Sequence, residues 1–271
     1  MFPRILHIHG PLYIRGYGLM LAIGLILFVF LTYKNPFRKK IISHEQFFNT
    51  IFIGLLSGII GGRFLFVIFE YDAFRNNLLE IFYPWVGGFS MLGAIPAVII
   101  TVALFLKKKS VPIISLLDLA AIYAPLIEAF GRIGCFLAGC CYGMPTKASN
   151  WFSVTFTNPN CLGTINTPLY PTQIYSSIAS LLSFILLYRL YIIAKKHNGA
   201  LLGSGLFLCV YLDLASLFRF IIDFWRGDRI IAFKLGSLTF SYYQLVPIGI
   251  ILITPFLLIL THRQYSKRKK L

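Results

Sequence analysis

Residues 131–143 read Gly131-Arg132-Ile133-Gly134-Cys135-Phe136-Leu137-Ala138-Gly139-Cys140-Cys141-Tyr142-Gly143 and close a long apolar run with an arginine inside it. A charged side chain at membrane depth costs at least ~2.5 kcal/mol on insertion scales, and such a residue marks a functional site by default. The glycines around Arg132 allow a neighbouring backbone or a ligand to approach closely. Arg132 is therefore the first candidate residue, and its role depends on what it faces.

The composition indicates a membrane protein. Of the 271 residues, 58% are hydrophobic and 13% are charged, whereas a soluble domain carries roughly 25% charged residues. Several apolar runs are long enough to span a bilayer, so the sequence predicts an all-α, polytopic integral membrane protein. We expect one transmembrane domain over residues 1–271, without a cleaved signal peptide, because the first apolar run is too long for one.

Seven spans are predicted, near residues 14–33, 47–70, 89–106, 112–136, 171–194, 201–223 and 243–262. If the spans alternate, one side receives fifteen basic residues: Lys34, Arg38, Lys39, Lys40, Lys107, Lys108, Lys109, Arg189, Lys195, Lys196, Arg263, Lys267, Arg268, Lys269 and Lys270. The other side receives six: Arg4, Arg75, Lys147, Arg226, Arg229 and Lys234. By the positive-inside rule, the N-terminus lies outside and the C-terminus lies in the cytoplasm. This distribution explains the net charge of +16 without nucleic acid as a partner.

The remaining four basic residues, Arg15, Arg63, Arg132 and Arg219, lie within spans or at their ends, each in the outer half. Four cations at one depth indicate a polar cavity that opens outward. The alternative is a set of separate ion pairs, or arginines whose side chains extend to the lipid headgroups. For Arg15 this alternative explains the position equally well.

Two acids offer partners for the deeper arginines. Glu128 precedes Arg132 by four residues, which is the better orientation for an ion pair on a helix, and Asp223 follows Arg219 by four residues. Even with both pairs formed, the deep arginines leave an excess of positive charge. Because a guanidinium group matches phosphate with a planar fork of donors, a phosphate headgroup is the natural ligand.

Four of the five cysteines, Cys135, Cys140, Cys141 and Cys161, fall on the outer side, at or in a long outer loop at about 137–170. Their spacing is not typical of a metal site and no histidine lies beside them, so we predict no metal. In an oxidising compartment, a disulfide from Cys140 or Cys141 to Cys161 would hold the outer loop over the cavity. The alternatives are a catalytic thiol on Cys140, activated by Arg132, or cysteines that pack as small hydrophobic residues.

With these features the sequence resembles the prolipoprotein diacylglyceryl transferases of the bacterial cytoplasmic membrane. The resemblance covers nearly the whole chain. It rests on seven motifs in the order of that family: residues 10–20, Gly62-Arg63, residues 85–93, Asp118, residues 131–134, residues 170–175 and residues 218–226. Each motif is short, but seven of them in order across seven spans are specific.

The resemblance implies a reaction, its substrates and its site residues. The family moves diacylglycerol from phosphatidylglycerol to the lipobox cysteine of a preprolipoprotein, and a thiolate displaces the phosphate ester. Arg132 and Arg219 match arginines of the family and are the expected catalytic residues. The expected substrate-binding residues are Arg63, Tyr17, Gln173, Arg226, Gly131 and Gly134. No cofactor is expected, and the expected partners are phosphatidylglycerol, the lipobox segment and membrane lipid.

The chain departs from the family's pattern at polar and proton-accepting positions. Leu92 stands where a histidine is usual, and Ala215 stands where a tyrosine is usual. Cys135, Ala138 and Cys140 stand where two asparagines and a glutamate are usual. These departures leave the proton acceptor open. They favour two alternative functions, a related membrane transferase with a different acceptor and a non-catalytic protein that binds or transports anionic lipid.

Overall fold

The structure, a computed structural model, describes residues 2–9, 12–75, 77–83, 88–147, 152–196, 201–236 and 238–270. Gly10, Pro11 and Trp85 from the predicted motifs, and residues 148–151 of the predicted outer loop, lie outside the described residues.

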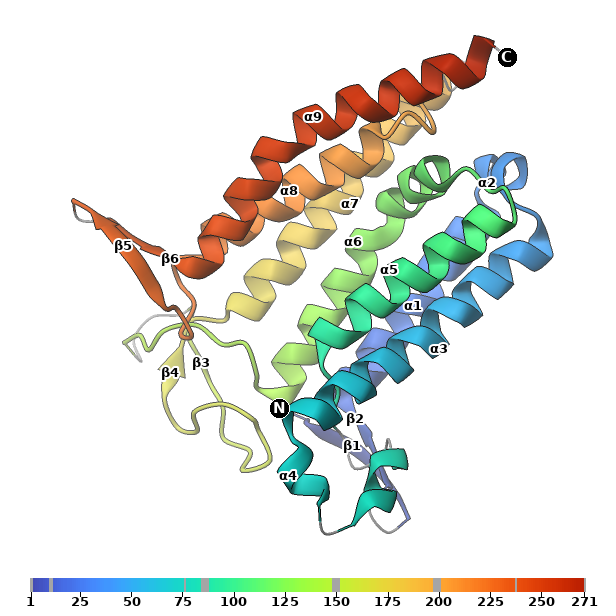
Figure 1. Cartoon of the computed structure of the whole chain (residues 1–271). Helices are drawn as coiled ribbons and strands as arrows, with labels where there is room; N and C mark the ends of the chain where they lie inside the picture. The colour runs from blue at the N-terminus through green and yellow to red at the C-terminus, as the bar shows by residue number, and fades with distance from the viewer. Residues whose placement is uncertain are drawn as a thin grey trace. The chain divides into compact units, whose positions relative to one another are not determined.

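Seven long helices make up most of the described chain (Figure 1). They are α1 (Gly16–Lys34), α3 (His44–Phe69), α5 (Met91–Lys108), α6 (Ile113–Ala138), α7 (Thr172–Lys196), α8 (Leu206–Asp223) and α9 (Tyr242–Lys270). Short helical segments lie in the connections: α2 (Pro36–Ile41), α4 (Tyr71–Phe74) and the 3-10 helix η1 (Leu78–Phe82). The predicted all-α class is confirmed.

Six of the described helices are long and apolar enough to cross a membrane: α1, α3, α5, α6, α7 and α9. This confirms a polytopic membrane protein. The sixth predicted span coincides with α8, which carries Asp213, Arg219 and Asp223 and is not among the six. The count of seven spans and the orientation of the termini stay predictions.

The sixth predicted span ends at the same residue as α8 but begins too early. It was expected at 201–223, whereas α8 begins at Leu206. Gly203 and Gly205 have φ angles of 87° and 91°, in the left-handed region that ends or turns a helix. At Gly205 a Cβ atom would also lie 2.3 Å from the Thr261 hydroxyl oxygen, so this turn requires glycine.

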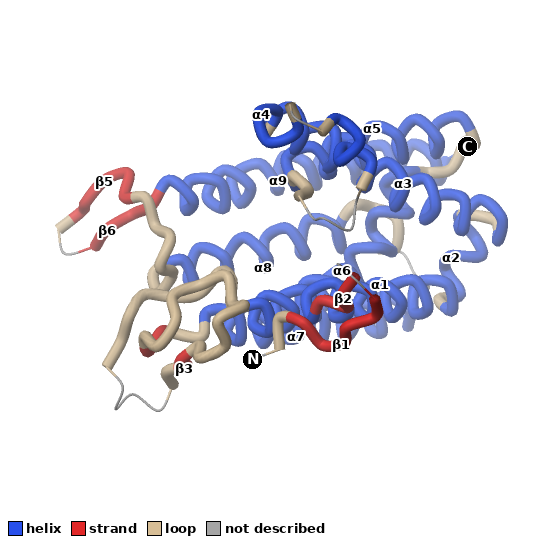
Figure 2. The backbone as a smooth tube through the Cα atoms, turned by 90° about the horizontal axis from the view of Figure 1, so that it is seen from below, coloured by secondary structure: helices blue, strands red, loops and turns tan. Residues whose placement is uncertain are grey.

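Among the described residues, three short two-stranded sheets that were not predicted from the sequence lie in the connections or before the first helix (Figure 2). They pair β1 (Arg4–His9) with β2 (Leu12–Arg15), β3 (Val154–Thr155) with β4 (Pro168–Leu169), and β5 (Ile231–Leu235) with β6 (Leu238–Ser241). The β3–β4 pair is antiparallel, with Val154 opposite Leu169. It folds the predicted outer loop back onto the start of α7.

The chain divides into two compact units. The first unit comprises residues 1–8, 13–34 and 117–271, and it contains α1, most of α6, and α7 to α9. The second unit comprises residues 9–12 and 35–116, and it contains α3 and α5. The expectation of a single transmembrane domain over residues 1–271 stays a prediction.

In the second unit, α3 and α5 pack against each other through small residues. A Cβ atom on Gly61 would lie 2.3 Å from the Ala97 Cβ and 2.8 Å from the Gly93 carbonyl oxygen. Such close approach of two backbones is the usual packing of helices in membranes, where small residues stand at the contact.

In the first unit, α8 is fixed at both ends by buried polar side chains. At its beginning, the carboxylate of Asp118 on α6 accepts hydrogen bonds from the backbone N–H groups of Gly203 (3.0 Å), Gly205 (2.8 Å) and Leu208 (3.0 Å). A carboxylate is favourable at a helix N-terminus, where N–H groups lack partners in the helix. Near its end, the Gln244 amide on α9 donates to the Phe220 carbonyl at 3.1 Å. These contacts place Arg219 of α8 opposite α6.

Candidate functional site

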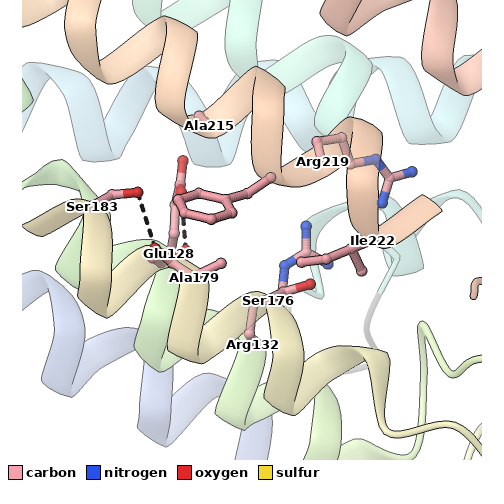
Figure 3. Close-up of a pocket in the computed structure, with 10 residues that line it drawn as sticks. Glu128, Arg132, Ser176, Ala179, Ser183, Ala215, Arg219 and Ile222 are labelled. Atoms are coloured by element: carbon pink, nitrogen blue, oxygen red, sulfur yellow. Dashed lines mark hydrogen bonds between the residues drawn. The ribbon is translucent and has the colours of Figure 1, made fainter. Parts of the chain in front are cut away.

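The candidate site is a pocket between α6, α7 and α8 in the first unit (Figure 3). Its volume is about 60 Å³, enough for several water molecules. It is lined by Glu128, Arg132, Ser176, Ala179, Ser180, Ser183, Ala215, Phe218, Arg219 and Ile222. Both predicted catalytic arginines are therefore in one pocket, on two different helices.

The two arginines differ in their partners. Arg219 lies 3.7 Å from the Asp223 carboxylate, and 31% of its side chain is exposed. Arg132 is half-buried and makes no hydrogen bond or ion pair with any described residue. Arg132 and Arg226 both repel the charge of Arg219 electrostatically, so the three guanidinium groups act on one another. An anion in this pocket would relieve that repulsion.

The ion pair between Glu128 and Arg132 that the i,i+4 spacing offered is not formed. Glu128 instead accepts a hydrogen bond from the Tyr211 hydroxyl and one from Ser180 Oγ at 3.3 Å. Tyr211 is 83 residues away along the chain, so the sequence spacing could not indicate it. As a result, the positive charge of Arg132 is not neutralised by its neighbour on the helix.

Asp223 is shared among several groups. It is fully buried, it accepts a hydrogen bond from Ser241 Oγ at 2.5 Å, and it lies 3.4 Å from the Arg229 guanidinium as well as near Arg219. A carboxylate divided between two arginines compensates each of them only in part. Arg229 was not among the predicted site residues, and its pairing with Asp223 leaves Arg219 the more available of the two arginines.

Arg226 lies just beyond α8 and is held by an acid that the sequence analysis did not consider. Its Nε and a terminal nitrogen donate to the two carboxylate oxygens of Asp228, at 2.7 and 2.5 Å. The same guanidinium group lies beside the Cys141 thiol. Arg226 therefore connects the arginines of the pocket to the cysteines that follow α6.

Three of the cysteines come together where α6 ends. The sulfur atoms of Cys135, Cys140 and Cys141 all lie within 4.8 Å of one another, a group that we call the thiol cluster. The chain reverses here because Gly139 and Cys141 both have left-handed backbone conformations, with φ angles of 74° and 57°. Adjacent side chains of an extended chain point to opposite sides, and the reversal brings Cys140 and Cys141 to the same side. The spacing alone did not indicate this cluster.

The start of α7 holds the reversal in place. The predicted substrate-binding residue Gln173, which is 1% exposed, donates its amide hydrogen to the Cys140 carbonyl at 2.7 Å. Thr172 donates its hydroxyl to the Cys141 carbonyl at 3.0 Å. The amide oxygen of Gln173 is buried without a hydrogen-bond partner among the described residues. The observed contact of Gln173 is thus with the backbone of the thiol cluster.

The pKa values of Cys140 and Cys141 shift in opposite directions. Both residues lie beyond the membrane-spanning part of α6. Hydrogen bonds with Cys135 and Cys140, and then the charges of Arg226 and Arg132, hold the pKa of the Cys141 thiol far below its ordinary value of 9.0. The pKa of Cys140 is raised by its hydrogen bonds with Cys135 and Cys141. Arg132, which was expected to activate Cys140, therefore acts together with Arg226 to favour the thiolate of Cys141.

Tyr17 and Gly134 lie next to the thiol cluster. A Cβ atom on Gly134 would lie 3.0 Å from the Tyr17 Cα and 3.1 Å from its carbonyl oxygen, so α1 rests directly on α6 at this glycine. The Tyr17 side chain is within electrostatic range of all three thiols and of Arg132. At Gly131, by contrast, a Cβ atom would meet nothing within 4 Å.

Arg63 belongs to the second unit, where it binds backbone rather than an acid. Its guanidinium donates to the carbonyl groups of Glu80 (2.6 Å), Ile81 (2.9 Å) and Gly88 (3.0 Å). Phe66, Phe74 and Phe89 lie within about 6 Å of its charge. The observed contacts of Arg63 hold the segment between α3 and α5, and its role in substrate binding stays a prediction.

The five cysteines are free thiols, so the disulfide expected between Cys140 or Cys141 and Cys161 is not formed in this structure. Cys161 nevertheless lies against the reversal, since a Cβ atom on Gly139 would be 2.7 Å from the Cys161 Cβ. A backbone hydrogen bond of 3.0 Å from Leu162 to Ala138 also holds the two segments together. The outer loop is thus attached to the end of α6 without a covalent link.

The sequence matches one protein family over nearly its whole length. The model of the prolipoprotein diacylglyceryl transferase family matches residues 3–260. A phosphatidylglycerol–prolipoprotein diacylglyceryl transferase of Clostridium tetani is 38% identical over 229 residues, which cover 84% of this chain and 86% of that protein. The protein of that name from Dechloromonas aromatica is 32% identical over 260 residues, 95% of this chain and 94% of the relative. A second such transferase from Clostridium perfringens is 34% identical over 217 residues, 79% of this chain and 80% of the relative.

Proposed function

Because this chain belongs to the prolipoprotein diacylglyceryl transferase family, we propose that it transfers a diacylglyceryl group from phosphatidylglycerol to a cysteine thiol of a prolipoprotein. The sulfur forms a thioether bond with the primary carbon of the diacylglyceryl group. The bond from that carbon to the phosphate oxygen breaks, and glycerol phosphate leaves with the electron pair. We place the reaction at the outer side of the bacterial cytoplasmic membrane, as the predicted orientation requires.

The observation that carries the proposal is the pair of arginines in one pocket. Negative charge develops on the phosphate oxygens as the carbon–oxygen bond breaks, and donors that are already in place stabilise it without reorganisation. Arg132 has no partner among the described residues, and Arg219 has only a shared carboxylate at 3.7 Å. Guanidinium groups in this state bind phosphate strongly, because each supplies charge and a fork of donors.

Three other predicted site residues support this assignment in different ways. Arg226 is held by Asp228 and adds positive potential to the pocket through its effect on Arg219. Gln173 holds the chain reversal, and Gly134 allows Tyr17 to lie close to α6. We therefore assign Arg132 and Arg219 the contact with the phosphate, and we assign Arg226, Gln173 and Gly134 the task of shaping the site around it.

A transfer assay tests the proposal. The full-length protein in lipid vesicles is supplied with labelled phosphatidylglycerol and a lipobox peptide, and the diacylglyceryl peptide is measured. We expect Arg132→Ala and Arg219→Ala each to lower kcat by about 10²- to 10³-fold, as the loss of one transition-state donor does in other enzymes. The matched control is Arg189→Ala, which removes an exposed arginine near the other end of α7.

Two results would contradict the proposal. A folded wild-type protein that binds phosphatidylglycerol but forms no thioether would mean that the acceptor is not a lipobox thiol. Transfer that persists in both arginine variants would mean that these residues do not stabilise the leaving phosphate. A change in KM alone would place the arginines in lipid binding rather than in the transition state.

A further inference from the structure

The thiol cluster has the geometry of a metal site. Its three sulfur atoms lie within 4.8 Å of one another. Zinc binds thiolate sulfur at about 2.3 Å in a tetrahedral arrangement, which places the sulfurs of one site roughly 3.8 Å apart. The side chains of Cys135, Cys140 and Cys141 therefore need to move by no more than about an ångström to share one ion.

Residues outside the thiol cluster hold its backbone in place by hydrogen bonds, as the residues around a metal site usually do for its ligands. The Cys140 N–H donates to the Cys135 carbonyl at 3.1 Å, which links the first ligand to the second. Gln173 and Thr172 fix the carbonyl groups of Cys140 and Cys141 from α7. Cys141 adopts a backbone conformation that is uncommon for a residue other than glycine. This arrangement holds three thiols on one side of the chain.

The charges around the cluster suit three thiolates with a divalent cation. Such a group carries one net negative charge. Arg226 is balanced by Asp228, whereas Arg132 has no ion pair with a described residue and lies within electrostatic range of Cys135 and Cys141. The positive potential of Arg132 thus reaches the thiol cluster as well as the pocket, and it favours a negatively charged metal–thiolate group. Thiolate ligands select soft or borderline cations such as zinc over magnesium or calcium.

We propose that Cys135, Cys140 and Cys141 bind one thiophilic divalent cation of the zinc class, with a fourth coordination position open to a thiol. Catalytic zinc sites commonly have three protein ligands and an open position, whereas structural sites have four protein ligands. The described residues bring three thiols together here, and Cys161, although it packs against Gly139, is not part of the cluster.

The open position has a role in the reaction, and this part of the inference rests on the proposed function. An acceptor thiol in that position would lose its proton to water, because a thiol that coordinates zinc is deprotonated. Its sulfur would then attack the primary carbon of the diacylglyceryl group, while the electron pair of the breaking carbon–oxygen bond goes to the phosphate at Arg132 and Arg219. The cation would thereby activate the thiol in a chain whose departures from the family's pattern leave the proton acceptor open.

Cobalt binding tests the metal site without any substrate. The full-length protein in detergent is freed of metal with a chelator under reducing conditions and titrated with Co²⁺ alone. We expect one ion per chain and the intense near-ultraviolet absorption of thiolate-to-cobalt charge transfer. Cys135→Ser, Cys140→Ser and Cys141→Ser should each weaken binding by at least about 100-fold, since even groups outside the ligand set contribute roughly 10- to 100-fold. Cys161→Ser is the matched control and should bind as the wild type does.

A second measurement needs no variant. Zinc should protect Cys135, Cys140 and Cys141 of the wild-type protein from alkylation and leave Cys161 and Cys209 unaffected, as mass spectrometry of the labelled peptides would show. Cobalt that binds without charge-transfer absorption, or zinc that protects none of the three thiols, would overturn the proposal.

The transfer assay separates this inference from the proposed function. Transfer that is lost in the metal-free protein and restored by zinc supports both. Transfer at full rate in metal-free protein overturns the role of the open position and leaves the proposed function intact. Cysteine-dependent metal binding in a protein that forms no thioether supports the metal site and contradicts the proposed function.

Discussion

Arg226 donates two hydrogen bonds to the carboxylate of Asp228, from Nε to Oδ1 at 2.7 Å and from a terminal nitrogen to Oδ2 at 2.5 Å. Two parallel hydrogen bonds of this kind fix the plane of a guanidinium group as well as its position. The side chain of Arg226 is 6% exposed while that of Asp228 is 55% exposed. The acid thus reaches in from solvent and orients an otherwise buried arginine beside Cys141.

The first prediction concerns the pH dependence of this pair. The hydrogen bond from Arg226 lowers the pKa of Asp228 below its ordinary value of 3.8. Because the pKa is lower in the folded protein, the pair stabilises the fold above pH 3.8, and this contribution is lost as the pH falls through the folded pKa. The melting temperature of Asp228→Asn should therefore lie below that of the wild type at neutral pH, and the two should converge in acid.

The control for this experiment is Asp72→Asn, which removes an exposed acid of α4. A difference between wild type and Asp228→Asn that stays constant into acid would show that the carboxylate charge does not stabilise the fold. The measurement is thermal unfolding in detergent at a series of pH values.

The second prediction compares two glycines of α6. Gly134→Ala would place a methyl group 3.0 Å from the Tyr17 Cα, and a backbone atom of a packed helix cannot easily yield. We expect a loss of about 1–3 kcal/mol in the free energy of unfolding, as for other overpacked sites. Gly131→Ala meets nothing within 4 Å and should stabilise the helix by roughly 0.5–1 kcal/mol. Equal effects of the two substitutions on stability would contradict the close approach of α1 at Gly134.

The third prediction concerns the Tyr211 hydroxyl, which donates to Glu128. Tyr211→Phe leaves a carboxylate that retains only the hydrogen bond of Ser180, so we expect a cost of about 1.5–3 kcal/mol in stability. In a Glu128→Gln background, Tyr211→Phe should destabilise the protein less. The double-mutant cycle then gives the interaction energy between the two side chains. Tyr188→Phe is the control, because the Tyr188 hydroxyl makes no hydrogen bond with a described residue. Additive effects in the cycle would mean that the two groups do not interact.

The fourth prediction concerns the start of α8. Asp118→Asn keeps the size of the side chain but removes the charge that three backbone N–H groups share. Since a hydrogen bond to a charged group contributes roughly 1.5–3 kcal/mol, we expect the amides of Gly203, Gly205 and Leu208 to exchange with solvent at least about tenfold faster. Hydrogen exchange read by mass spectrometry measures this. Unchanged exchange at these amides would show that the charge is not needed for the cap.

Long apolar runs predicted the helices well, because a polar backbone in lipid has few alternatives to a helix. The arginine positions predicted the pocket, since Arg132 and Arg219 are exceptions in their runs. Contacts between distant segments were not predictable in this way. Glu128 pairs with Tyr211 rather than with Arg132, and the left-handed conformation of Cys141 depends on hydrogen bonds from α7. The thiol cluster therefore could not be predicted from the sequence and was identified only in the structure.

The carboxylate of Asp118 has a consequence for how the chain is made. Gly203, the first backbone partner of Asp118 to be synthesised, lies 85 residues later in the chain. At a synthesis rate of about 5–20 residues per second, that partner leaves the ribosome roughly 4–17 s after the acid does. During this interval the carboxyl group of Asp118 lacks its three backbone hydrogen-bond partners. The synthesis of Gly203, Gly205 and Leu208 then supplies these partners, so the start of α8 sets the earliest point in translation at which Asp118 can reach its folded environment.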